Sequence, residues 1–175
     1  GVIDSPDIPL NVSRSALQTD RKVRSIGNFI SKKVSDRLKE IKSENKEYYA
    51  QIWDAIAPFI KIGAMEDEKF ADQVQDLMIF NTTKEFNEND LSNSDNELIK
   101  TNNKSFTTIK GYIHRLNGDN KKVLYTTDEV SQANALNLWI SQSAEVLKLD
   151  TVIDTQFIPW LEERNKDITF QRVDS

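Results

Sequence analysis

The sequence predicts a mixed α/β protein, in which a three-helix unit is followed by a small three-layer α/β/α unit with a short parallel sheet. Two observations support this prediction. Between residues 20 and 83, apolar residues recur at intervals of three and four, which is the period of amphipathic helices. Between residues 105 and 175, short strand-like runs alternate with helical patterns, which is typical of a parallel sheet covered by helices on both faces.

The first unit, residues 20–83, is expected to contain three packed helices. The first carries an apolar stripe from Val23 to Ile41, with basic residues on its solvent face. The second has its stripe over residues 49–60; we expect Pro58 to kink or shorten it and Gly63 to end it. The third covers residues 66–80 and has acidic residues in its first turn, where the helix dipole favours them.

Residues 84–104 are predicted to form a mobile linker or a long loop. Asparagines are scattered here among charged residues, and few apolar residues are available for burial. These asparagines are Asn87, Asn89, Asn93, Asn96, Asn102 and Asn103.

The last unit, residues 105–175, is expected to be the α/β part. It begins with a helix capped by Ser105, whose core face runs from Phe106 to Leu116. A capping box of Thr126 and Glu129 is expected to start a second helix, which continues to about residue 140. A third helix is expected over residues 154–164. The predicted strands cover residues 122–126, 146–149 and 168–173.

Composition excludes several classes of site and protein. The chain has no cysteine, so disulfides and thiolate metal sites are impossible, and no apolar run approaches the roughly 20 residues of a membrane span. The single histidine, His114, is expected at the surface and offers no catalytic triad or histidine cluster. Asp4 and Asp7 lack a third ligand nearby, so we expect no metal site. Because no glycine-rich phosphate loop occurs, the chain has no recognisable nucleotide pocket of its own.

Charge is unevenly distributed along the chain. Residues 21–46 carry nine Lys or Arg against three acids, which is +6, so the remainder of a chain with net charge −5 carries −11. A solvated helix face is the commoner cause of such a stretch, and an anionic partner is the alternative. Exposed aromatic residues do not interleave with the basic ones and the chain as a whole is acidic, so we expect neither nucleic-acid nor membrane binding.

The first residues carry a specific motif. Residues 1–18 read GVIDSPDIPLNVSRSALQ, and this run resembles the segment G-V-[VI]-D-S-x-D-[LI]-P-L-N-[VIL]-S-R-x-x-L-Q of the ninety-kilodalton heat-shock, or HtpG-type, chaperones. Further similarities follow in family order as KKVSDRL, IKIGAMED, VIDTQFIPWLEE and FQRVDS. The resemblance covers essentially the whole chain and is weakest over residues 84–104. It implies the later part of the middle segment of a cytoplasmic chaperone that acts in the stress response.

The resemblance also implies a role for the first 19 residues as a catalytic-arginine loop. In this family the matching arginine, here Arg14, contacts the terminal phosphate of ATP bound in a preceding domain, and the matching glutamine, Gln18, assists. Arginine suits this role because its planar guanidinium stays charged and can pair with the oxygens of a transferring phosphoryl group. We expect Asn11 and Ser13 to support the loop, with Ser13 capping the turn that carries Arg14.

The implied partners lie mostly outside this chain. ATP with Mg would be bound mainly by the N-terminal nucleotide-binding domain, so the chain alone is expected to hold no cofactor and to be no enzyme. A C-terminal domain would make the full-length protein a homodimer. Phe157 and Trp160, in the predicted helix near the end of the chain, are candidate contacts for unfolded client proteins, with core packing as the alternative.

One alternative function remains open from the sequence. The chain would then be a pure protein–protein interaction module for clients or co-chaperones, and Arg14 would have only a structural role. An anion-binding role for residues 21–46 is a third possibility, which predicts strongly salt-dependent binding to polyanions.

Overall fold

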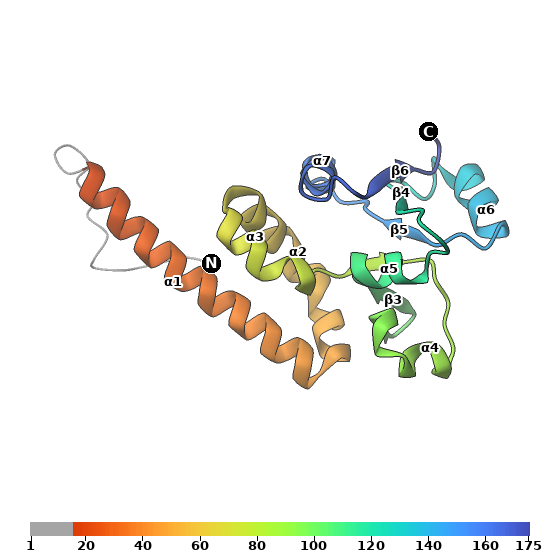
Figure 1. Cartoon of the computed structure of the whole chain (residues 1–175), viewed down its shortest axis with the longest axis horizontal. Coiled ribbons are helices and arrows are strands. Elements are labelled where there is room, and N and C mark those ends of the chain that lie inside the picture. The colour runs from red at the N-terminus through yellow and green to blue at the C-terminus, as the bar shows by residue number, and fades with distance from the viewer. Residues whose placement is uncertain (1–15) are drawn as a thin grey trace.

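The computed structural model describes residues 16–175, with side chains from residue 21 onward, and it confirms a mixed α/β fold (Figure 1). The chain begins with a long helix, α1, which runs diagonally at one side of the molecule, and α2 and α3 lie between it and the sheet. These helices span Ala16–Glu44, Lys46–Glu66 and Glu68–Val74. Three helices were expected here, and three are present.

Side-chain caps separate the three helices. The Asn45 side chain accepts a hydrogen bond from the backbone N–H of Tyr48 at the start of α2, and Asp67 caps α3 in the same way. Pro58 lies inside α2, which continues past it, and Gly63 does not end this helix as predicted. Gly63 instead allows close packing, because a Cβ at this position would lie 3.0 Å from the ring of Phe70 on α3.

The third helix is shorter than predicted. After Val74 the chain makes a 3-10 turn, η1 (Gln75–Leu77), and then enters a strand, β1 (Phe80–Thr82). Four consecutive residues, 77–80, are all buried. Since a helix on a protein surface buries only one stripe, such a run fits a chain segment that passes through the core between two layers.

Within residues 16–175, the sheet has six strands in the order β2-β3-β1-β5-β4-β6. The predicted parallel strands are confirmed as β5-β4-β6, and an antiparallel half, β2-β3-β1, which the sequence did not predict, extends them. The two halves join where β1 pairs antiparallel with β5, with Thr82 opposite Leu147. The remaining strands are β2 (Leu98–Thr101), β3 (Lys104–Thr107), β4 (Lys122–Thr126), β5 (Val146–Lys148) and β6 (Thr169–Arg172).

The prediction of a linker or long loop over residues 84–104 is wrong, because regular secondary structure is present there. This stretch contains α4 (Glu88–Ser92), a 3-10 turn η2 (Ser94–Asn96) and β2, and β3 begins at its last residue. The asparagines form caps and turns: Asn87 makes a reciprocal capping box with Asp90, and Asn102 takes a positive φ of 49° in the turn between β2 and β3. Turn chemistry therefore explains the asparagine content that suggested disorder.

The helix that was expected to begin at Ser105 starts later. Residues 104–107 form β3, so Phe106 belongs to the sheet, and α5 spans Ile109–Arg115 with Thr108 as its cap. The capping box of Thr126 and Glu129 is also absent, because Thr126 ends β4. Its hydroxyl donates to the side-chain oxygen of Gln132, the residue before α6 (Ala133–Ser141).

Helices cover both faces of the parallel half of the sheet, so the three-layer arrangement is confirmed. Alternate residues on each strand face opposite layers: Val123 and Leu147 belong to the main core, whereas Leu124 and Val146 pack against α6. The other face is covered by α5 and by α7, which spans Asp154–Arg164 as predicted. In Figure 1, α6 lies at the end of the molecule opposite α1.

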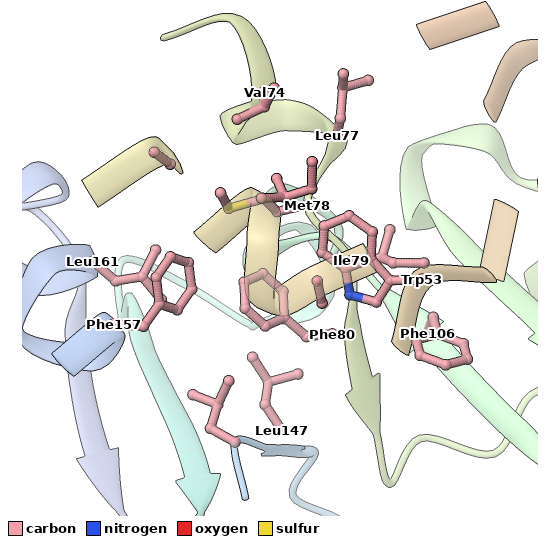
Figure 2. Close-up of a cluster of buried hydrophobic side chains, with 14 of the residues drawn as sticks. Trp53, Val74, Leu77, Met78, Ile79, Phe80, Phe106, Leu147, Phe157 and Leu161 are labelled. Carbon is pink, nitrogen blue, oxygen red and sulfur yellow. The ribbon is translucent and has the colours of Figure 1, made fainter. Parts of the chain in front are cut away.

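The main hydrophobic core is shared by the helical part and the sheet. In Figure 2, Phe157 and Leu161 of α7 point toward Met78 and Phe80, and Trp53 of α2 lies close by. Residues from both predicted units thus form one buried cluster. The division of the chain into separately folding domains at residues 19, 83 and 104 stays a prediction.

Two glycines on helices give a matched test of this packing. A Cβ at Gly111 would lie 2.2 Å from the carbonyl oxygen of Asn96, whereas a Cβ at Gly27 on α1 would meet nothing within 4 Å. We expect Gly111→Ala to lower the free energy of unfolding by about 2–3 kcal/mol, because the backbone of α5 or η2 would have to shift to make room for the methyl group. Gly27→Ala should raise it by about 0.5–1 kcal/mol, since alanine favours helix. Urea denaturation measures both, and equal effects would contradict the close approach of α5 to η2.

Candidate functional site

The residues of the predicted arginine loop lie outside the described part of the chain. Asn11, Ser13 and Arg14 fall within residues 1–15, as do Asp4 and Asp7. Gln18 belongs to the first turn of α1, where only the backbone is described. The roles of these residues stay predictions.

Some classes of site can be assessed within residues 16–175. In this range, no three His, Asp or Glu residues lie together in a way that could hold a metal ion. His114 is exposed on α5, as expected. No helix in the same range is both long enough and apolar enough to cross a membrane.

The two aromatic residues predicted to contact clients have different surroundings on α7. Phe157 is fully buried and stacks between Phe80 and Trp160, with ring centroids 6.3 Å and 5.2 Å away. Its side chain therefore belongs to the core, and it leaves no surface for a client in this fold. Trp160 is half-buried at the edge of the same cluster.

Trp160 lines a hollow of about 300 Å³ between η1, α5 and α7. This volume lies at the lower end of the range for ligand pockets. Most of its exposed surface is apolar, although polar and charged side chains also line it, and such a surface suits a bulky apolar side chain better than a charged one. The apolar lining consists of Met78, Phe80, Ile109, Ile113, Trp160, Leu161 and Ile168.

The charged groups around the hollow are largely paired within the protein. The guanidinium of Arg164 lies over the Trp160 ring, 5.1 Å from its centroid, and bonds the Asp72 carboxylate at 2.5 Å. It also donates to the side-chain oxygen of Gln75 at 3.1 Å. Lys121 pairs with Asp167 at 3.1 Å. The third cation of the lining, Lys110, is in no ion pair among the described residues, but Asp76 and Glu97 add two carboxylates, so the hollow does not favour a triphosphate.

A buried ion pair positions the helix that carries Trp160. Lys61 of α2 and Asp154, the first residue of α7, lie 2.7 Å apart, and their side chains are 7% and 2% exposed. The second carboxylate oxygen of Asp154 accepts hydrogen bonds from the backbone N–H and the hydroxyl of Thr151. The Lys61 ammonium also lies 5.1 Å from the centroid of the Phe157 ring, a favourable cation–π position. The start of α7 is therefore held against α2 by several directional contacts.

A second polar network joins α5 to the sheet. Arg115 makes two hydrogen bonds to the Glu145 carboxylate, at 2.6 and 2.9 Å, and donates to the Asn96 carbonyl and the Thr107 hydroxyl. The Tyr112 hydroxyl donates to the Glu145 carbonyl and accepts from the backbone N–H of Leu124. Burial raises the pKa of Tyr112 to about 12, so its hydroxyl remains a donor at neutral pH. The network fixes the α5 wall of the hollow.

The sequence predictions missed these buried charged residues, although the position of Lys61 in the sequence indicates burial. Lys61 lies four residues after Ala57 and eight after Trp53, which places it on the buried stripe of α2. A lysine on such a stripe needs a buried anion as its partner. The apolar periodicity of α2 alone could therefore have predicted that a buried carboxylate lies near Lys61. For Asp154 and for the pair of Arg115 and Glu145 no such signal exists, because their partners are distant in sequence.

Comparison with known proteins gives consistent matches over the chain. A family model described as Hsp90 protein matches residues 1–174. "Chaperone protein HtpG" of Porphyromonas gingivalis is 33% identical and that of Bacteroides thetaiotaomicron 35% identical, each over 175 residues, covering all of this chain and 24% of the relative. The chloroplastic heat shock protein 90-5 of Arabidopsis thaliana is 35% identical over 160 residues, covering 88% of this chain and 18% of that protein. The chain thus spans about a quarter of the length of the bacterial relatives.

A solved structure has a similar fold. The middle domain of a Plasmodium falciparum heat shock protein superposes with a TM-score of 0.64 at 19% identity, covering 89% of this chain and 60% of that one. At this identity the similarity concerns the fold alone.

The Lys61–Asp154 pair can be tested by a double-mutant cycle. Lys61→Met or Asp154→Asn alone should lower the free energy of unfolding by about 3–5 kcal/mol, because each leaves a buried charge without a partner. The double variant should lose much less than the sum, with a coupling energy of at least about 2 kcal/mol. Urea denaturation measures all three.

An exposed ion pair serves as the control for this cycle. Lys104→Met, which removes the exposed pair with Asp54, should lower the free energy of unfolding by less than about 1 kcal/mol. Additive losses in the cycle would show that the two charges do not interact.

Proposed function

The chain belongs to the Hsp90 protein family, and we propose that it acts as the middle segment of an ATP-dependent chaperone. In this proposal Arg14 contacts the terminal phosphate of ATP bound in a preceding domain, Gln18 assists, and the surface around Trp160 contacts unfolded clients. The observation that carries the proposal is the motif over residues 1–18, which ends in S-R-S-A-L-Q at the beginning of α1. The chain alone would not hydrolyse ATP.

The position of the motif next to α1 supports this mechanism. Arg14 lies two residues before a helix of 29 residues, whose second half packs against α2 and α3 through Ser35 and Leu38. A helix of this length spans about 40 Å and resists bending. Because its second half is packed on α2 and α3, α1 would hold the segment that carries Arg14 in a fixed position relative to the core. Such anchoring helps catalysis because an arginine that is held in place loses little further entropy when it reaches the phosphate.

Arginine contributes to phosphoryl transfer through charge. Negative charge spreads over the oxygens of the transferring group, and a guanidinium delivered from another domain pairs with them. ATP and Mg would be held by the preceding domain; the hollow near Trp160 does not favour them, since two of its three cations are paired and Asp76 and Glu97 also line it. Hydrolysis would then require closure of the two domains, which couples turnover to conformation.

Client contact is the second part of the proposal. The hollow combines an apolar lining with a half-buried tryptophan at its edge, which suits the bulky apolar side chains that unfolded proteins expose. The proposal places the protein in the cytoplasm, as a homodimer through a C-terminal domain.

The arginine assignment predicts a loss of ATP turnover in the intact chaperone. Arg14→Ala should lower kcat about a hundredfold or more, as expected for an arginine delivered to a phosphoryl group, and Gln18→Ala should have a smaller effect. Arg21→Ala is the matched control, because Arg21 is exposed on α1 outside the motif, and its turnover should be unchanged. Steady-state phosphate release measures all three. Unchanged turnover in Arg14→Ala together with weaker client protection would instead favour the pure interaction module.

The client assignment predicts weaker protection of an unfolding protein. Trp160→Ala and Ile113→Asn alter different walls of the hollow, and both should reduce the suppression of heat-induced citrate synthase aggregation, because the apolar surface is lost. Tyr48→Ala is the control, since Tyr48 is an exposed aromatic residue on α2 away from the hollow. Light scattering below the melting temperature of every variant measures the effect. Full protection by both hollow variants would move the client surface elsewhere.

A further inference from the structure

The loop between α5 and β4 contains the one Asn-Gly pair of the sequence, Asn117–Gly118. The loop begins after Arg115, where α5 ends, and reaches β4 at Lys122, and residues 117–121 are all exposed. Gly118 has a positive φ of 77°, a left-handed conformation that glycine adopts at little cost. A Cβ at Gly118 would meet nothing within 4 Å, so the surroundings leave this pair free to move.

The side-chain amide of Asn117 is not held by the fold. Among residues 21–175, neither this amide nor the backbone N–H of Gly118 takes part in a hydrogen bond. By contrast, the Asn93 side chain, at the start of η2, accepts a hydrogen bond from the backbone N–H of Asp95 at 3.1 Å. Asn117 can therefore rotate until its side-chain carbon, Cγ, meets the backbone nitrogen of the next residue.

We propose that Asn117–Gly118 is a site of spontaneous covalent modification, at which the asparagine is converted to aspartate and isoaspartate through a succinimide. In the first step, the backbone nitrogen of Gly118 forms a bond to Cγ of Asn117, and the bond from Cγ to the side-chain nitrogen breaks. The backbone nitrogen loses a proton and the departing NH2 group gains one, so ammonia leaves. Water then opens the ring at either of its two carbonyls. The only co-reactant is water.

Two features favour ring closure at this pair over the Asn-Ser pair Asn93–Ser94. The reacting atoms belong to neighbouring residues, so the step is intramolecular and needs only a backbone that can rotate into the reactive geometry. An exposed loop permits this rotation at Asn117, whereas the cap and the 3-10 turn restrict it at Asn93. Glycine also carries no side chain that would crowd the attacking nitrogen. The fold therefore favours modification of Asn117.

The modified loop is compatible with the fold around it. On one side, α5 is held by the ion pair of Arg115 with Glu145. On the other, the backbone N–H of Thr169 donates to the Lys121 carbonyl at 2.9 Å, where β4 and β6 meet. Isoaspartate lengthens the main chain by one carbon, which an exposed loop can accommodate. The product is a folded chain with an added carboxylate, and the inference is independent of the proposed roles of Arg14 and of the client surface.

Peptide mapping by mass spectrometry tests the proposal with the 175-residue chain, aged in buffer and in urea. Aspartate and isoaspartate should form at Asn117 in the folded chain at a rate within about threefold of that in urea, because opening a mobile loop costs almost no free energy. Modification of Asn93 should be at least about tenfold slower in the folded chain than in urea, because its cap must open first. Hydroxylamine, which attacks succinimides, should cleave the folded chain between Asn117 and Gly118.

Two variants separate the succinimide route from direct hydrolysis. Asn117→Gln should abolish modification and hydroxylamine cleavage at this position, because the longer side chain would have to close a less favoured ring. Gly118→Ala should slow modification at least about tenfold, because a methyl group crowds the attacking nitrogen. Circular dichroism should show native helix content in both variants. An Asn117 that stays unmodified in the folded chain, aspartate without isoaspartate, or a rate that Gly118→Ala leaves unchanged would overturn the proposal.

Discussion

The buried contact between Lys61 and Asp154 determines how the two parts of this molecule are joined. Both charges are removed from water, so each depends on the other and on the hydrogen bonds from Thr151 to remain stable in the core. Apolar packing alone tolerates small shifts between layers, whereas a charged pair with a fixed distance does not. Because the pair joins α2 to the first residue of α7, it sets the position of Phe157 and Trp160 and of the strand that follows them.

This constraint connects the regions proposed to act in the chaperone. The long α1 packs on α2 and α3, and α2 bears the lysine that holds α7. The second half of α1 and the hollow at Trp160 therefore border the same hydrophobic core. In the proposed mechanism, a movement of the segment before α1 would be transmitted to the client surface through packed helices.

Periodicity and turn signals in the sequence were sufficient for much of this architecture. The first two helices, the parallel strands and α7 were predicted at nearly their observed positions, because each carries a run of residues that suits only one period, whereas the third helix proved about half as long as predicted. The antiparallel strands β1, β2 and β3 were not predicted, since each has only three or four residues and includes several polar ones. Their stability comes from neighbouring strands and from α2, which no local pattern reveals. The asparagines of residues 84–104 were misread because the same amide group can cap a helix, form a turn or remain in solvent.

The sequence by itself determined the family, the helical and parallel-strand elements, and the arginine motif, since all of these depend on residues close together along the chain. Only the tertiary structure decided that Phe157 is a core residue, that Trp160 borders a hollow, and that two buried networks hold its walls. The physical reason is distance along the chain: Lys61 and Asp154 are 93 residues apart, and Arg115 and Glu145 are 30 apart. A side chain's partner, and with it the cost of its burial, exists only after the chain has folded.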